Sequence, residues 1–187
     1  MSTRAVLLAV RREALDAGFY AAGESLAVDF VDTIKLKKSP TIDLLDGRYE
    51  LFWQSHEALL PGVQSYPPRA SALALRAVVR SLFESAIDGV PLDDAMVRVL
   101  NEAAGSSFTY SHMEQGTKGL FFVTKAVGEG DPALAAVARS AISSLAQHDE
   151  LRRCGSPRCS MLYVSRSAGR LWCSNTCGNR MRVARAQ

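Results

Sequence analysis

The chain has 187 residues, of which 48% are hydrophobic and 22% are charged. This length and composition exclude a disordered or low-complexity chain and are typical of one compact domain with a small appendage. The first apolar run, residues 5–10, ends at Arg11 and Arg12. It is too short for a signal peptide or a membrane-spanning helix, so we expect a cytoplasmic protein that does not bind a membrane.

The charge is distributed unevenly along the chain. Residues 151–187 contain eight arginines and no acidic residue, a charge of +8, whereas residues 1–150 carry −5, and the whole chain carries +3. The C-terminal segment can therefore attract a polyanion, while the rest of the chain is not expected to do so.

Hydrophobic periodicity predicts helices over most of the first 150 residues. In chain order they begin at residues 5–10, then cover residues 26–34, 49–60, 73–87 (ending at Gly89), 92–104 (capped near Asp93) and 131–147 (capped by Asp131). For residues 26–34 a short buried strand is the alternative, and we favour the helix.

The period changes to that of strands between the last two helices, where residues 107–110 and 119–127 predict an antiparallel hairpin. The predicted fold class is therefore α+β, mainly α. We expect a helical N-terminal domain with one β-hairpin over residues 1–148, followed by a small zinc-binding module over residues 149–187. No flexible linker separates the two, so they should be held in a fixed relation.

Three acidic residues, Glu24, Asp29 and Asp32, lie close together in the sequence. They allow two interpretations, an acidic ligand site or an exposed helix face. We favour the exposed face, because no further ligand is spaced to join them.

The strongest motif is the cysteine pattern C-x4-C-x13-C-x3-C, formed by Cys154, Cys159, Cys173 and Cys177. The first pair brackets turn-forming residues, and the second pair falls on one face of the first turn of a helix that begins near Ser174. Four thiolates fill the tetrahedral shell of Zn²⁺, so we predict a structural zinc rather than a catalytic one. Disulfides are the alternative, and a reducing cytoplasm disfavours them.

Two short strands are expected between the cysteine pairs, at residues 161–164 and 170–172, with a turn between them. The module would then be a knuckle, a hairpin and a helix. Its small core would consist of Leu162, Tyr163, Leu171 and Trp172, so metal binding would supply much of its folding free energy.

No catalytic residue is predicted. The three histidines are isolated in the sequence, no serine lies in a nucleophile-elbow context, and no cysteine occurs outside the C-terminal cluster. We therefore do not expect an enzyme.

The run 172–180, WCSNTCGNR, with residues 151–154 before it and 181–185 after it, resembles the CGNR-type zinc finger. Upstream, residues 24–33 and 43–45 resemble the opening of the ABATE domain, which precedes this finger in a family of stress-induced bacterial transcription regulators. The family generally has Asn where this chain has Asp32. The resemblance implies a zinc-dependent, DNA-binding regulator.

The basic module is accordingly predicted to bind DNA through phosphates or guanine edges. The candidate contacts are Arg166 and Arg170 from the hairpin turn, and Asn179, Arg180, Arg182 and Arg185 from the C-terminal helix, which we expect from about Ser174 to Ala186.

The alternative is a zinc-stabilised interaction module that binds no nucleic acid. Its partner would be another protein, a second copy of the chain, or a small effector that the sequence does not identify. The opposite charges of the two parts would allow the basic module to bind the acidic body of its own or of a neighbouring chain. Arginines of the helix in ion pairs with the body would favour this alternative, and solvent-facing guanidinium groups would favour DNA binding.

Overall fold

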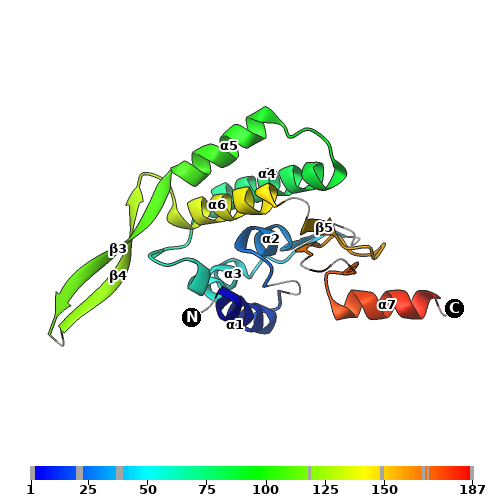
Figure 1. Ribbon diagram of the computed structural model, residues 1–187, viewed down its shortest axis with the longest axis horizontal. Helices are drawn as coiled ribbons and strands as arrows, with labels where there is room; N and C mark the ends of the chain where they lie inside the picture. The colour runs from blue at the N-terminus through cyan, green and yellow to red at the C-terminus, as the bar shows by residue number, and fades with distance from the viewer. Residues whose placement is uncertain are drawn as a thin grey trace.

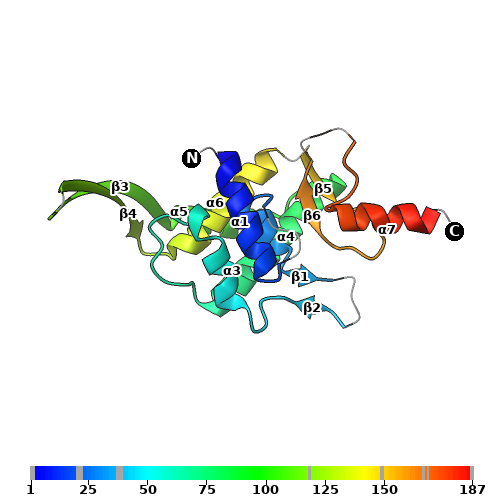
Figure 2. The same cartoon turned by 90° about the horizontal axis from the view of Figure 1, so that it is seen from below.

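The computed structural model describes residues 3–19, 23–36, 40–117, 119–147, 150–165, 167 and 169–185. The molecule is elongated: a helical body carries a two-stranded arm at one end and the C-terminal helix at the other (Figures 1 and 2). None of the described helices is long and apolar enough to span a membrane.

Three of the helix ends in the body lie at capping residues that the sequence predicts, namely Gly89, Asp93 and Asp131. The helices of the body are α1 (Thr3–Asp16), α2 (Leu26–Val31), α3 (Tyr49–Ser55), α4 (Arg69–Asp88), α5 (Asp94–Gly105) and α6 (Pro132–Ala146), with a short 3-10 helix, η1 (Glu57–Leu59), after α3. The carboxylates of Asp93 and Asp131 accept hydrogen bonds from the first amides of α5 and α6. Gly89, with φ of 66°, closes α4 in the left-handed conformation. The predicted helices are confirmed, including the helix rather than the strand at α2, but two of them are shorter than predicted. Helix α2 ends at Val31 and Ile34 lies in a strand, and the helix predicted over residues 49–60 ends at Ser55 and is followed only by η1.

The short helix α2 lies at the centre of the hydrophobic core. All six of its residues are buried, and both α4 and α6 pack against it. The Phe30 ring lies 5.3 Å from Phe52 and 5.4 Å from Trp53, measured between ring centroids. A helix of this length is too short to be stable in water, so these contacts hold it in place.

The same core continues into the C-terminal module. Leu151 and Leu162 are 1% and 0% exposed, and they belong to the cluster of buried side chains that contains α2 and α4. Leu171, which we expected to be buried, is 57% exposed. The module is therefore anchored in the core of the body instead of having a separate small core.

The described residues form three two-stranded antiparallel sheets. They are β1 (Ile34–Lys35) with β2 (Ile42–Asp43), β3 (Ser107–Gly116) with β4 (Gly119–Gly128), and β5 (Leu151–Arg153) with β6 (Leu162–Val164). The second of these is the predicted hairpin, and its first strand extends well beyond residue 110 to form the projecting arm of Figure 1. The α+β, mainly helical class is confirmed.

The predicted strand pair within the C-terminal module is wrong. The partner of β6 is β5, with Arg152 opposite Tyr163, and residues 170–172 form no strand. The hydrogen bond from Cys154 N to Met161 O, 2.9 Å, continues the β5–β6 ladder towards the cysteines. Residues 170–172 approach β6 through a side chain instead, because the Tyr163 hydroxyl donates to Arg170 O at 2.7 Å.

Candidate metal centre and basic helix

The four cysteines converge on one point at the end of the β5–β6 hairpin. Their Sγ atoms all lie within 4.8 Å of one another. The Sγ atom of Cys173 lies 3.7 Å from that of Cys159 and 3.7 Å from that of Cys177. Zinc–sulfur bonds of about 2.3 Å in a tetrahedron require sulfur atoms about 3.8 Å apart. The cluster therefore fits a tetrahedral metal ion, and four thiolates match the ligand preference of zinc.

The first pair of cysteines is positioned by a knuckle, residues 154–161, which leaves β5 and returns as β6. The Cys159 amide donates to Ser156 O at 3.0 Å, which turns the backbone back on itself. The Gly155 amide donates to Leu171 O at 3.0 Å and so ties the knuckle to the segment that carries the second pair. This turn brings both sulfur atoms to the same side of the hairpin.

The second pair is positioned by the start of α7 (Asn175–Arg185), as expected from its spacing. Ser174 caps this helix: its hydroxyl accepts from the Cys177 amide at 3.3 Å, and its carbonyl accepts from the Gly178 amide at 3.1 Å. The Cys173 amide points at the Cys154 sulfur, 3.5 Å away. Backbone N–H groups directed at sulfur favour the thiolate form that a metal requires.

The indole of Trp172 is wedged between two glycines of the site. A Cβ atom placed on Gly178 would lie 2.9 Å from the indole Cδ1, and one placed on Gly155 would lie 3.0 Å from its Cζ3. Both distances are shorter than ordinary carbon contacts, so each glycine is required for close approach. The ring thus joins the knuckle to the first turn of α7 and fixes the separation of the two cysteine pairs.

Without a cation, the sulfur atoms cannot all ionise together. Hydrogen bonds from Cys159 and Cys173 lower the pKa of Cys154. The same thiol contacts, together with burial, raise the pKa values of Cys159 and Cys173. A bound dication offsets this mutual repulsion, so metal binding and thiol deprotonation are coupled.

The body holds the module through buried polar contacts with the acidic residues near α2. Both carboxylate oxygens of Asp32 accept from the Leu162 amide at 3.0 Å. Arg80 of α4 lies 3.7 Å from Asp32 and donates to Ser160 O at 2.7 Å. Burial raises the pKa of Asp32 well above its usual range, and the Leu162 amide and the Arg80 guanidinium oppose this without cancelling it.

Glu24 makes a second connection, to Arg170. The two side chains are 2.6 Å apart, and the other Glu24 oxygen accepts from the Val164 amide at 3.2 Å. Arg170 also donates to the carbonyls of Val164, Trp172 and Cys173 and lies over the Tyr163 ring at 4.5 Å. The structure therefore places Arg170 as a link between Glu24 of the body, β6 and the segment that carries the second pair of cysteines.

Asp29 supports this link from inside the body. Its carboxylate accepts from the amides of Gly23 and Glu24 at 2.7 and 3.1 Å and lies 3.3 Å from His56 Nε2. Asp29 and Asp32 are each 5% exposed. The expected exposed acidic face is therefore wrong: Asp32 is covered by Leu162 of the metal-binding module, and Asp29 is enclosed by residues of the body itself.

Helix α7 projects from the end of the molecule opposite the arm, and several of its polar side chains are exposed (Figure 1). Asn179, Arg180 and Arg182 are exposed, and Arg182 donates to Asn179 Oδ1. Among the described residues, neither arginine forms an ion pair with an acidic group. Arg158 of the knuckle is also exposed. Arg166 and the side chain of Arg185 lie outside the described residues.

A groove of about 710 Å³ runs between the knuckle and α7. Polar and cationic groups (Arg158, Thr176, Asn179 and Arg180) and apolar groups (Pro157, Met181 and Val183) line it. Its cationic groups come from both parts of the metal site. The relative position of these groups therefore depends on the four cysteines.

Comparison with family models matches two adjoining segments. Residues 24–148 match ABATE, described as "Putative stress-induced transcription regulator", and residues 150–187 match the CGNR zinc finger. The chain belongs to the ABATE family. A comparison with curated proteins finds no match.

Each residue that names the CGNR finger has a distinct position in the structure. Cys177 is a metal ligand candidate, and Gly178 leaves the space that the Trp172 indole fills. Asn179 and Arg180 are exposed and contribute nothing to the core. The roles of the first two residues are therefore explained by the structure of the finger, whereas the last two are exposed side chains.

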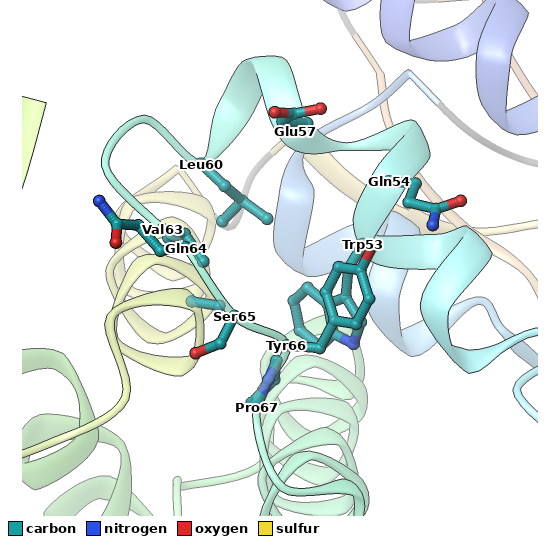
Figure 3. Close-up of a pocket in the computed structure, with 10 residues that line it drawn as sticks. Trp53, Gln54, Glu57, Leu60, Val63, Gln64, Ser65, Tyr66 and Pro67 are labelled. Carbon is teal, nitrogen blue, oxygen red and sulfur yellow. The ribbon is translucent and has the colours of Figure 1, made fainter. Parts of the chain in front are cut away.

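The ABATE domain carries a separate pocket of about 440 Å³ between α3 and the loop before α4 (Figure 3). Trp53, Leu60 and Tyr66 supply apolar walls, and Gln54 and Glu57 supply polar groups. The buried Trp53 indole N–H lies beside the Tyr49 hydroxyl, but no described residue accepts from it in good geometry. The volume is in the range of small-molecule sites.

Sequence reasoning missed the residues that join the two parts, namely Arg80, the buried role of Asp32, and the Glu24–Arg170 pair. The one signal was the nearness of three acidic groups to each other in an otherwise apolar segment. Charged residues inside an apolar run are expected to be paired if that run is buried.

Proposed function

We propose that this protein is a DNA-binding regulator in which a structural zinc ion orders α7 for contact with DNA. The observation that carries the proposal is that Arg180 and Arg182 are exposed and form no ion pair with the described part of the acidic body. Guanidinium groups in this state can neutralise phosphates or fork onto guanine.

Unlike Arg180 and Arg182, two arginines of the module that lie nearer the body form ion pairs with it. Arg153 lies 2.8 Å from Asp88, and Arg170 lies 2.6 Å from Glu24. The body therefore has acidic partners for the C-terminal module, and these partners engage Arg153 of β5 and Arg170 before the second pair of cysteines. An autoinhibitory docking of α7 on the body has no support from these contacts, so DNA is favoured over the body as the partner of Arg180.

The groove between knuckle and α7 gives the proposed interface its shape. Arg158, Asn179 and Arg180 lie along it, so a phosphate backbone there would meet cations from two segments that the metal holds together. Asn179 has the donor and acceptor that adenine recognition requires. The four thiolates close the metal shell, so the proposal includes no catalytic step.

The test is fluorescence anisotropy of zinc-loaded protein with labelled genomic DNA fragments over a series of salt concentrations. The double variant Arg180→Ala/Arg182→Ala should weaken binding and lower the slope of log K against log salt by about 1.8, since each lost phosphate contact contributes about 0.9. Cys177→Ser, which removes a metal ligand, should abolish the salt-dependent binding.

The matched control is Arg12→Ala/Arg98→Ala, because both arginines are exposed on the body and the variant has the same net charge. This control should bind DNA as the unmodified protein does. Equal loss in both double variants would show that net charge alone drives binding, and undiminished binding by the α7 variant would refute the proposed interface.

A further inference from the structure

The β3–β4 arm carries an unusual concentration of exposed apolar side chains. Of the eighteen large hydrophobic residues exposed in the described part of the chain, seven belong to this hairpin. They are Phe108, Tyr110, Met113, Leu120, Phe121, Phe122 and Val127, with exposed fractions from 46% to 77%. Isolated exposed apolar residues are ordinary, but a contiguous group on one projecting element marks an interaction surface.

The arm has little support from the rest of the molecule. Both strands are ten residues long, and the hairpin projects from the end of α5 and the start of α6 (Figures 1 and 2). A two-stranded hairpin alone is marginally stable in water, and its outer edges leave backbone groups unpaired. Its length and composition are therefore explained better by a partner than by the isolated chain.

Apolar residues occur on both faces of the arm. Residues directly opposite in the register share a face, so Phe108 and Val127 lie on one side with Tyr110, while Met113 and Phe122 lie on the other. The one described ion pair of the arm, Glu114 with Lys125 at 2.7 Å, is internal to it. These two charges therefore remain paired with each other when another molecule covers the arm.

We propose that the arm is a dimerisation element that intertwines with the arm of a second copy of this chain. Scaled by their exposed fractions, the seven side chains offer on the order of 700 Å² per chain. A stable interface buries about 800 Å² per partner, and one face alone would supply roughly half of the available area. Only a partner that covers both faces comes close to the required size.

The arm of a second copy can cover both faces, because the contact between two identical arms is self-complementary. A two-fold axis places the same apolar residues on both sides of the interface, and two ribbons of the same hand of twist can coil around each other. The arm and α7 lie at opposite ends of the molecule, so this contact leaves α7 exposed (Figure 1). Such a dimer presents two basic helices, and single small DNA-binding modules commonly need a second contact.

The test is sedimentation velocity of the full, zinc-loaded chain across micromolar concentrations, without DNA. The expected species is a dimer. Leu120→Ser should raise the dimer Kd at least about tenfold, and Phe122→Ser on the order of a hundredfold, because each change removes apolar area from both copies. Tyr110→Ser, on the opposite face, should weaken the dimer as well.

The matched control is Leu8→Ser in α1, since Leu8 is 59% exposed and Leu120 is 63% exposed. Leu8→Ser should leave the dimer Kd unchanged. Circular dichroism and zinc content should stay constant in all four variants, because none of the replaced side chains belongs to the core. A monomer at all concentrations, or a dimer that depends on only one face of the arm, would overturn the proposal. Neither result bears on DNA binding.

Discussion

Replacement of Gly178 by alanine tests whether the Trp172 indole sets the geometry of the metal site. Within a helix, alanine is more favourable than glycine by about 1 kcal/mol, so helix propensity alone predicts a more stable α7. The new methyl carbon would, however, lie 2.9 Å from the indole Cδ1. Overpacking of this kind costs about 1–3 kcal/mol.

The indole cannot shift directly away from the new methyl group without approaching the knuckle. Its opposite edge already lies against Gly155, where an added Cβ would be 3.0 Å from Cζ3. We therefore expect the steric cost to exceed the gain in helix propensity by about 1 kcal/mol, which corresponds to a roughly fivefold loss in zinc affinity. The loss should fall on the metal site, because the first turn of α7 carries Cys177.

Zinc affinity would be measured by competition with a chromophoric chelator, with Gly105→Ala as the matched control. Gly105 also lies in a helix, and an added Cβ there meets nothing within 4 Å. This control should keep the zinc affinity and gain slightly in stability. The double variant Gly178→Ala/Trp172→Leu should regain part of the lost affinity relative to additivity. Zinc affinity in Gly178→Ala equal to or above that of the unmodified protein would refute the role of the indole.

Three further outcomes are expected. Cys177→Ser should reduce bound zinc well below one equivalent in metal analysis, with loss of helical signal confined to the C-terminal module, and full zinc retention would contradict the ligand assignment. Asp32→Ala should lower the free energy of unfolding in urea by about 3 kcal/mol, because the Leu162 amide loses its acceptor and Arg80 loses an ion-pair partner. Asp32→Asn keeps an acceptor for the Leu162 amide and should cost less than half as much. Equal costs would show that the acceptor is unimportant. Burial opposes ionisation of Asp43, but the hydrogen bonds from Arg76 outweigh burial and lower the pKa of the carboxyl group. The ionised Asp43 therefore stabilises the fold at pH values above its unfolded-state pKa of about 3.9, and this stabilisation is lost as the pH falls through the folded-state pKa. Asp43→Asn should therefore be less stable than the unmodified protein at pH 7 and equally stable at strongly acidic pH, and a pH-independent difference would argue against this ion pair.

The pairing of β6 shows why one part of the metal-binding module could not be predicted. Residues 151–153 and 170–172 both have short apolar and basic patterns next to a cysteine, so periodicity does not distinguish them as partners of residues 162–164. The choice is made by the knuckle, whose Cys154–Met161 hydrogen bond aligns β5 with β6. Both segments lie close to residues 162–164 in the sequence, so their distance along the chain does not show which of them pairs with these residues.

The metal ligands, the helix caps and the basic character of the C-terminal segment were determined by the sequence itself. These features are local: the cysteines lie within a short span, the carboxylates of Asp93 and Asp131 act on amides two or three residues away, and net charge is a sum over residues. Such signals need no knowledge of distant contacts.

Only the tertiary structure decided which charged groups serve the fold and which remain exposed. In the sequence, Glu24, Asp32 and Arg170 cannot be distinguished from charged residues on a surface. In the structure they join the body to the C-terminal module, because β6 and the knuckle pack on α2 and α4. Arg180 lies ten residues from Arg170 and is exposed, because α7 points away from that contact. The environment of a charge depends on the surface that covers it, and long-range packing sets that surface.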